Sequence, residues 1–299
     1  MKIQMLLLPA LALAMAITAG CGSSSTTPQF SRMTFMSTRG ATPATNMFSS
    51  KLDGSDVTPI PFSSTNVYFV SSSADSKTVV FMSATRDIWV ENSDGSGQTQ
   101  LTTSGHIQWS RISPNGKKIV YDDYSTNHVG VMNIDGTGIV DLTPTLPTGM
   151  SYCYYGSFSA DSLQIVFVCS GNPGTGIYTI KPDGTGIATV QVRTSGGAQF
   201  PFFTPDGKQI VFVGSFTAAN SPANVPTTSG VGSVNIDGTS EKLLVANMYE
   251  LVVLNSNLYY LNPCSGTAQI IKSNLDGSNP VTLSTTTNTD DLYYAFGGC

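Results

Sequence analysis

The chain has 299 residues, of which 40% are hydrophobic and only 11% are charged, and its formal net charge at pH 7 is −5. A typical globular domain has about a quarter of its residues charged, so this composition favours a turn-rich, all-β, extracytoplasmic protein. The sequence contains no basic stripe, and nucleic acid is therefore not expected as a partner.

The first 20 residues predict a signal peptide that is removed from the folded protein. Lys2 supplies a positive charge, and residues 5–17 form an apolar run interrupted only by Pro9. This run is too short to cross a bilayer as a helix, which needs about 20 apolar residues.

The segment Ile17-Thr18-Ala19-Gly20-Cys21 resembles the lipobox of bacterial lipoproteins, with threonine where leucine is usual. The resemblance implies that Cys21 becomes the first residue and carries lipid. Because aspartate does not follow Cys21, it also implies an outer-membrane location. Ordinary secretion with an unmodified Cys21 is the alternative. Residues 21–29 are expected to form a flexible tether.

A repeat of about 40 residues organises the rest of the chain. An Asp-Gly pair marks each copy, and the aspartates are Asp53, Asp94, Asp135, Asp183, Asp237 and Asp276. Asp-Gly between two apolar runs predicts a hairpin with a two-residue turn in which both residues have positive φ. Because a period near 40 residues with four short strands is typical of propeller blades, residues 30–299 are predicted to form an all-β, six-bladed β-propeller.

Four strands, A to D from the axis outwards, are expected in each blade. In the third copy they are predicted at residues 106–111, 118–121, 128–133 and 139–142. The B strands are unbroken apolar runs, which indicates that both of their faces are covered. The first copy lacks an A strand.

Residues 291–296 are predicted to supply this missing strand, so that a C-terminal strand completes the first blade and closes the ring. Closure removes exposed sheet edges. Deleting residues 290–299 should therefore unfold or aggregate the domain.

Two copies carry the fullest form of the repeat, at residues 113–121 with 133–137 and at residues 204–212 with 235–239. Their shared motif consists of Ser/Thr-Pro-x-Gly-Lys, an apolar strand and Asn-x-Asp-Gly-Thr. It resembles the TolB-type propeller repeat, a relative of the WD repeat. The resemblance covers residues 30–299 and implies a propeller in the bacterial cell envelope. TolB also has an N-terminal α/β domain, which is not expected here, so its role in the Tol–Pal system is not implied.

Alternation of strand direction sorts the connections onto two faces. The A–B and C–D turns are short and similar in every copy, and we call their side the uniform face. The B–C and D–A loops differ in length and composition, and we call their side the variable face. Long loops in compact folds are often functional, so the variable face is expected to bind the partner. In the longest predicted loop, residues 215–229, the candidate contacts are Ser215, Asn220 and Asn224.

Six further candidate binding residues lie on or beside predicted A strands: His106, Arg111, Tyr152, Phe200, Tyr249 and Glu250. Aromatic side chains at a channel mouth can stack on a sugar or hold a peptide, and packing between blades is the alternative. Arg111 and Glu250 together would give a polar lining.

No catalytic set, metal site or cofactor is expected. His106 and His128 are placed too far apart for a zinc site, and the Asp-Gly aspartates suit turns better than calcium. The motifs G-x-S-x-G, C-x-x-C-H and G-x-G-x-x-G do not occur. The favoured function is a membrane-anchored envelope lipoprotein that binds a protein, peptide or glycan. The alternatives are an enzyme of lyase or glycosidase type with an unidentified channel site, and a structural envelope component.

One disulfide follows from strand register. A turn centred near Asp161 pairs Phe158 with Gln164, which places Cys153 opposite Cys169. Opposed cysteines of antiparallel strands can meet disulfide geometry, and an oxidising envelope favours the bond. Cys264 and Cys299 are expected on opposite faces, and their state is left open.

Overall fold

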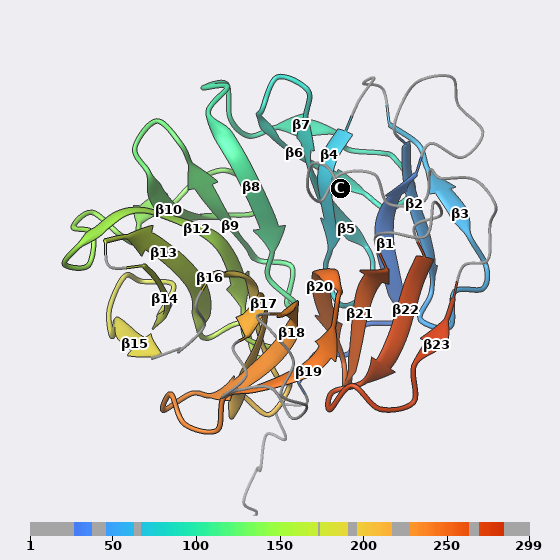
Figure 1. The fold of residues 1–299 in the computed structure, drawn as a ribbon. Helices are drawn as coiled ribbons and strands as arrows, with labels where there is room; N and C mark the ends of the chain where they lie inside the picture. The colour runs from blue at the N-terminus through green and yellow to red at the C-terminus, as the bar shows by residue number, and fades with distance from the viewer. Residues whose placement is uncertain are drawn as a thin grey trace, which may run out of the picture.

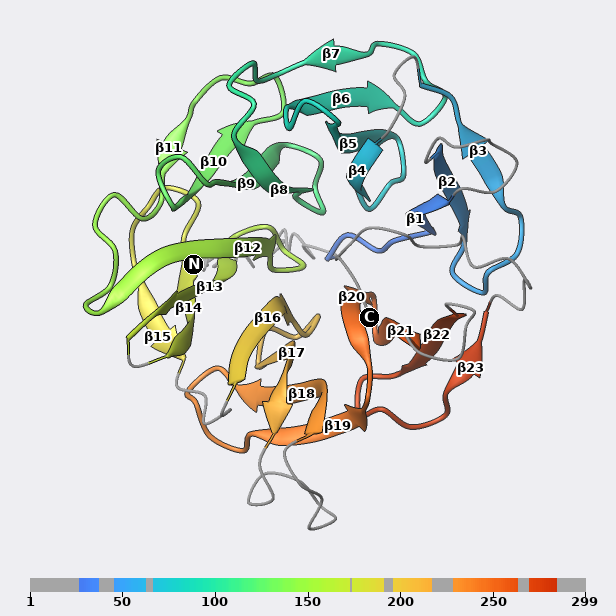
Figure 2. The same ribbon diagram turned by 45° about the horizontal axis from the view of Figure 1, so that its top comes forward.

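The computed structural model describes residues 27–37, 46–62, 67–172, 174–190, 196–216, 228–262 and 269–283. These residues form six antiparallel sheets arranged around one axis (Figures 1 and 2). The predicted all-β, six-bladed propeller is thus confirmed. The described part of the chain has no helix that could cross a membrane.

Each sheet is one blade, and its first strand lies nearest the axis (Figure 2). Blade one has β1 (Arg32–Ser37), β2 (Asn46–Lys51) and β3 (Thr58–Ile60); blade two has β4 (Val67–Ser72), β5 (Thr78–Ser83), β6 (Ile88–Asn92) and β7 (Thr99–Gln100). Blade three has β8 (Ile107–Ile112), β9 (Lys118–Asp123), β10 (His128–Asn133) and β11 (Val140–Asp141); blade four has β12 (Met150–Phe158), β13 (Ile165–Gly171), β14 (Thr175–Ile180) and β15 (Ala188–Val190). Blade five has β16 (Gly196–Phe203), β17 (Gln209–Phe216), β18 (Thr228–Asn235) and β19 (Lys242–Ala246); blade six has β20 (Tyr249–Leu254), β21 (Asn257–Asn262), β22 (Gln269–Asn274) and β23 (Val281–Thr282).

The second strand of each blade forms the core, as the unbroken apolar runs predict. In β5 and β13 every residue from Val79 to Ser83 and from Ile165 to Ser170 is buried. Such strands are covered on both faces because a neighbouring blade packs on each side. The predicted closing strand, residues 291–296, lies outside the described residues and stays a prediction.

The Asp-Gly turns differ from the expected two-residue type. In all six, only the glycine has positive φ, between +81° and +83°. Its N–H bonds to the carbonyl of the residue three positions earlier, as Gly95 does to Asn92 at 2.8 Å. The loop is therefore a type I turn followed by a left-handed glycine, the three-residue hairpin. The prediction was wrong because one more residue enters the loop, which moves the positive φ to the glycine alone.

The six aspartates serve these turns. Each carboxylate accepts the hydroxyl and the N–H of the Ser or Thr two residues later, as Asp135 does from Thr137 at 2.6 and 2.9 Å. The hydroxyl bonds are the main cause that lowers the pKa of every one of these aspartates. Their charge thus stabilises hairpins of the uniform face.

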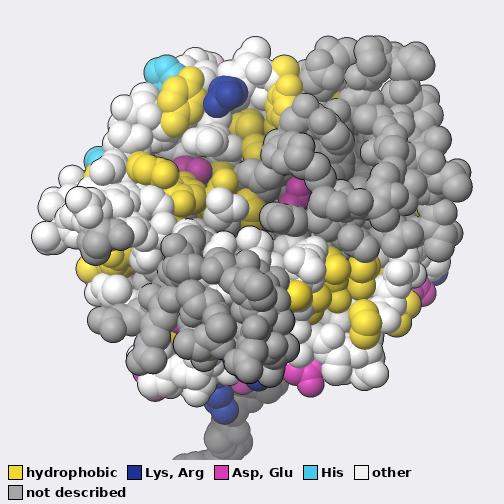
Figure 3. Space-filling model, viewed as in Figure 1, with side chains coloured by type: hydrophobic (Ala, Val, Ile, Leu, Met, Phe, Trp, Pro, Cys, Tyr) yellow, Lys and Arg dark blue, Asp and Glu magenta, His cyan; other side chains and the backbone are white. Residues whose placement is uncertain are grey.

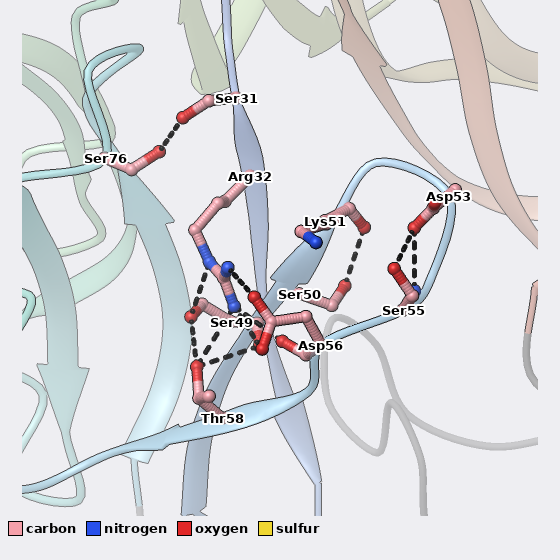
Figure 4. Close-up of polar contacts among 10 residues, drawn as sticks. All are labelled: Ser31, Arg32, Ser49, Ser50, Lys51, Asp53, Ser55, Asp56, Thr58 and Ser76. Carbon is pink, nitrogen blue, oxygen red and sulfur yellow. Dashed lines mark hydrogen bonds and ion pairs between the residues drawn. The ribbon is translucent and has the colours of Figure 1, made fainter.

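A polar network holds the first blade together (Figure 4). From β1, the guanidinium of Arg32 donates to the carboxylate of Asp56 at 2.7 Å and to the Ser49 hydroxyl at 3.1 Å. The side chain therefore crosses β2 and fixes the turn before β3. Beside it, the hydroxyls of Ser31 and Ser76 lie 3.2 Å apart and link this blade to the A–B turn of blade two.

Candidate binding site on the variable face

Every described innermost strand from β4 to β20 contains a one-residue bulge, at Phe69, Gln108, Tyr155, Phe200 and Glu250. β12 and β16 each have a second register shift nearer their start. Of the five bulge residues, all except Gln108 have φ between +49° and +59°. Positive φ is uncommon for residues other than glycine, and bulges often re-aim a side chain near a functional site.

The bulges bring aromatic rings together at the axis. The ring of Trp109 lies 4.7 Å from that of Phe69, 5.5 Å from that of Tyr155 and 5.7 Å from that of Phe200. Phe200 is only 4% exposed. Its ring packs between blades, against the rings of Trp109 and Tyr155, and this is the second of the two alternatives that the sequence left open.

A pocket of about 240 Å³ opens on the variable face between blades three and four. Its lining comes from the starts of the inner strands and from the loop between β9 and β10, and consists of Gln108, Asp122, Asp123, Tyr124, Asn127, Tyr152, Cys153, Tyr154, Tyr155 and Gln199. In Figure 3, hydrophobic side chains gather around an acidic group over the region that Figure 1 labels β8, β9 and β12.

Asp122 is one of the residues that line this pocket, and its carboxyl oxygens are buried. Asp122 is 3% exposed, and neither of its side-chain oxygens makes a hydrogen bond of ordinary geometry to any described residue. Burial raises the pKa of Asp122 well above its usual range, and the peptide N–H of Tyr155 offsets this only in part. A buried acid with so little hydrogen bonding from the described residues is costly.

Three tyrosines of β12 form one wall of the pocket. The rings of Tyr152 and Tyr154 are stacked with centroids 5.1 Å apart, and the ring of Tyr155 meets that of Tyr154 edge-on at 4.5 Å. Tyr152 is 46% exposed. Burial raises the pKa of Tyr154 and of Tyr155, and the charge of Asp122 adds to both shifts. Both phenols therefore stay protonated at neutral pH.

Tyr124 forms the opposite rim with 43% of its surface exposed. The guanidinium of Arg86 lies 5.3 Å from its ring centroid, and the His106 ring lies 5.3 Å from it. His106 thus belongs to the rim of this site, immediately before β8, as its predicted position on the variable face required.

A disulfide joins the two strands below the tyrosine wall. Cys153 of β12 pairs directly with Cys169 of β13, and their sulfurs are bonded. The link restrains β12 at the pocket, because Cys153 is itself a lining residue.

Arg111 and Glu250 do not form a joint lining. Glu250 occupies the bulge of β20, the equivalent of Gln108 in β8, whereas Arg111 lies three residues further along β8. Arg111 is stacked on Phe202, with its guanidinium 4.6 Å from the ring centroid, and burial lowers its pKa to about 10. It belongs to a second, smaller pocket of about 90 Å³ on the axis at the uniform face.

The N-terminal segment borders this axial pocket. Pro28, Gln29 and Phe30 line it together with Pro114 and Pro205, which belong to A–B turns. The chain therefore joins the propeller at the centre of the uniform face, where the first strand in Figure 2 starts close to the axis.

The remaining candidate residues come from blades five and six. Ser215 lies in β17, opposite Ser229 of β18, and their hydroxyls are 3.2 Å apart. The predicted loop is therefore shorter than expected, because the strand ladder continues to Phe216 and Thr228. Asn220 and Asn224 lie outside the described residues, and Tyr249 is described only as the first residue of β20.

Similar solved structures show that the same architecture serves unrelated proteins. A crystal structure of TolB from Acinetobacter baumannii matches with a TM-score of 0.66 at 14% identity, over 83% of this chain and 62% of that chain. The chain therefore spans less than two thirds of that TolB chain. This chain has a TolB-like propeller fold.

Two further matches with the TolB-like fold have other functions in their names. A structure of a nidogen/laminin complex matches with a TM-score of 0.63 at 13% identity, over 83% of this chain and 91% of that chain. An oligogalacturonate lyase in complex with manganese matches with a TM-score of 0.55 at 12% identity, over 77% and 71%. No family model matches the sequence, and no curated protein is similar to it. At these identities the likeness establishes the fold, and function must come from the site.

Asp122 was not among the site residues expected from the sequence, although the repeat contains a signal for it. Counted from the Ser or Thr that opens each A–B turn, the position of Asp122 in the B strand corresponds to Met82, Val168 and Val213 in the other three matching blades. All three are buried hydrophobic residues. The other three matching blades have a hydrophobic side chain at this position, so the acid in blade three is a departure from the repeat that points to a site residue.

Proposed function

We propose that the protein is an extracytoplasmic binding module whose variable face recognises a protein or peptide partner. The observation that carries the proposal is the pocket at Asp122, where two half-exposed tyrosines, Tyr124 and Tyr152, frame a buried acid whose oxygens accept no hydrogen bond of ordinary geometry from the described residues. Tyrosine is enriched at protein interfaces because it combines a large apolar surface with a hydroxyl. The uniform face is less suited, since its aspartates and hydroxyls are bonded within the turns.

The comparisons are compatible with this role. The TolB structure and the nidogen/laminin complex match this propeller, and the second is a complex of two proteins. These likenesses support a propeller as an adaptable scaffold, and the pocket supplies the reason to place recognition on the variable face.

The experiment is a pull-down from membrane and envelope extracts, with the protein cross-linked to its neighbours. We expect specific partners that are lost when Tyr124 and Tyr152 are both replaced by serine. The matched control is Leu163→Ser, which removes an exposed apolar side chain from the uniform face. Partners that survive the tyrosine changes but disappear with Leu163→Ser would move recognition to the other face.

We further propose that the module is anchored in the bacterial outer membrane by lipid on Cys21. The lipobox-like segment before Cys21 supports this, and so does the Cys153–Cys169 disulfide, since such bonds persist in oxidising compartments outside the cytoplasm. Intact-mass measurement of the mature N-terminus should find an acylated Cys21. Cys21→Ser should release the protein into the soluble fraction, and continued sedimentation with outer membranes would contradict the proposal.

A further inference from the structure

The Arg86 guanidinium lies over the Tyr124 ring at the rim of the Asp122 pocket, but no cationic side chain is among the residues that line it. The lining residues include two aspartates and four tyrosines. The two aspartates differ in the hydrogen bonds that they accept. Asp123 already accepts the N–H and the hydroxyl of Ser125, at 2.8 and 2.6 Å. Asp122 is the group whose oxygens find no such donors in the described chain.

The chemistry that would complete the site follows from these two facts. A buried carboxylate is stabilised by a cation that also donates hydrogen bonds, and such charge-assisted bonds are roughly twice as strong as neutral ones. Aromatic walls add a further attraction, because the face of a tyrosine ring is negative and draws a cation placed over it. Tyr152, Tyr154 and Tyr155 supply rings on one side. The Tyr124 ring on the other side already has the Arg86 guanidinium 5.3 Å from its centroid.

The size of the pocket limits the ligand. A volume of about 240 Å³ is below the roughly 300–1,000 Å³ of pockets that enclose a drug-sized molecule. It suits one side chain that enters from the variable face. An unbranched alkyl chain would pass between the tyrosine rings and deliver its charged end to the carboxyl group of Asp122.

We propose that the Asp122 pocket binds the cationic end of a basic side chain, most simply the ammonium group of a lysine, of the partner polypeptide. This inference rests on the proposed function in that it takes the variable face as the recognition surface. It adds the chemical identity of the contact that the partner must make there.

The site has a built-in pH dependence. The raised pKa of Asp122 means that the group must lose its proton when the ammonium binds. The other titratable or charged groups around it are Asp123 and the tyrosines at 124, 152, 154 and 155, with Arg86 and His106 against Tyr124 at the rim. Burial raises the pKa of Tyr154 and of Tyr155, so these two phenols stay neutral. Affinity for lysine is therefore expected to rise with pH until Asp122 is ionised in the free protein, and then to level off.

The experiment titrates the whole protein with two small probes. Nα-acetyl-lysine methylamide carries the ammonium group, and Nα-acetyl-norleucine methylamide has the same chain without it. Binding is followed by ligand-observed NMR and by the amide shifts of Cys153 and Tyr155. At pH 8 we expect the lysine probe to bind roughly tenfold or more tightly than the norleucine probe, as expected for one charge-assisted contact.

Two variants test the role of the carboxyl group. Asp122→Asn should abolish the preference for lysine. Asp122→Leu should do the same, and it introduces the residue type that blade six has at the corresponding position, Leu261. Glu91→Gln is the matched control, because Glu91 is another buried acid with a raised pKa but lies outside the pocket. It should leave the preference unchanged.

The outcomes separate this inference from the proposed function. Equal binding of both probes, or a lysine preference that survives in both Asp122 variants, overturns the inference. If partners are still captured in a Tyr152-dependent manner in that case, the binding module stands and only its ligand chemistry falls. If the lysine preference is found but no partner depends on the tyrosines, the pocket stands and the proposed function falls.

Discussion

The side-chain amide of Asn255 makes two hydrogen bonds to the backbone of Phe30, which lies 225 residues earlier in the chain. Its Nδ2 donates to the Phe30 carbonyl at 2.9 Å, and its Oδ1 accepts the Phe30 N–H at 2.8 Å. The amide thus pairs with both backbone groups of Phe30, as the backbone of a neighbouring strand would. Because Asn255 lies in the A–B turn of blade six and Phe30 precedes β1, the pair joins the last blade to the first. The Tyr259 hydroxyl adds a second link, to the Leu52 carbonyl at 3.1 Å.

Removing the Asn255–Phe30 hydrogen bonds should weaken the ring. Asn255→Ala loses both hydrogen bonds and forces alanine into a φ of +52°, so we expect a loss of about 2–3 kcal/mol in the free energy of unfolding. Asn255→Gly loses the same bonds but tolerates the backbone, and should cost about 1–2 kcal/mol. Urea unfolding of the three proteins measures both values. Unchanged midpoints in both variants would show that the first blade is held by other contacts.

Replacing the acid of the candidate pocket should stabilise the fold. Asp122→Leu removes a buried carboxyl without hydrogen-bond partners in the described chain, and we expect a gain of about 1–3 kcal/mol at pH 8. Thermal unfolding measures it, with Met82→Leu as a control for a change of aliphatic shape at the equivalent position. A loss of stability in Asp122→Leu would mean that the carboxyl group is paired in the folded protein.

Glu91 should make stability fall as pH rises. It is 2% exposed and accepts one hydrogen bond, from Gln98 at 3.1 Å, and burial raises its pKa from 4.5 to about 7. Between these values the folded state keeps a proton that the unfolded state has lost, so stability decreases from pH 4.5 to 7 and then levels off.

The test of this behaviour compares Glu91→Gln with the parent protein. The two should differ little near pH 4, and the variant should be more stable by on the order of 2 kcal/mol at pH 8. Urea unfolding at several pH values gives the comparison. Parallel curves for the two proteins across this range would rule out Glu91 as the source of the slope.

The disulfide should stabilise the fold by an amount that depends on the logarithm of the length of the loop that it closes. Cys153 and Cys169 are 16 residues apart, and a loop of about 15 residues corresponds to about 3 kcal/mol. The double change of Cys153 and Cys169 to alanine should cost about that much and abolish the effect of reductant on the melting temperature. Peptide mass spectrometry without reduction should recover the cross-linked pair from the parent protein.

The fold could be predicted because its signals are local and repeated. Ser113 and Thr204 each open a turn five residues before an apolar strand, and Ser73 and Ser159 open equivalent turns in blades two and four. Repetition averages out the ambiguity of any single short strand. The hairpin at Asp94 shows the limit: Asp-Gly locates the turn but does not distinguish a two-residue loop from a three-residue loop.

The site was harder to predict because it depends on departures from the repeat. The bulge that turns Tyr155 towards the axis comes from a register shift that no composition marks, since Phe200 and Glu250 occupy the same position with different chemistry. For Phe200 the sequence left two alternatives open, a ring at the channel mouth and a ring packed between blades, because a bulge changes the inside–outside alternation of a strand. Asp122 was recognisable only by alignment of the copies with one another.

The entry of the chain at the centre of the uniform face sets an orientation. Pro28 to Phe30 lie at the axis on that side, and the eight residues from Gly22 to Gln29 span at most about 28 Å. A lipid on Cys21 would hold the propeller close to the membrane, with the uniform face and the axial pocket directed towards the bilayer. The Asp122 pocket, on the opposite pole, would then look away from the membrane and meet partners that approach from the surrounding compartment.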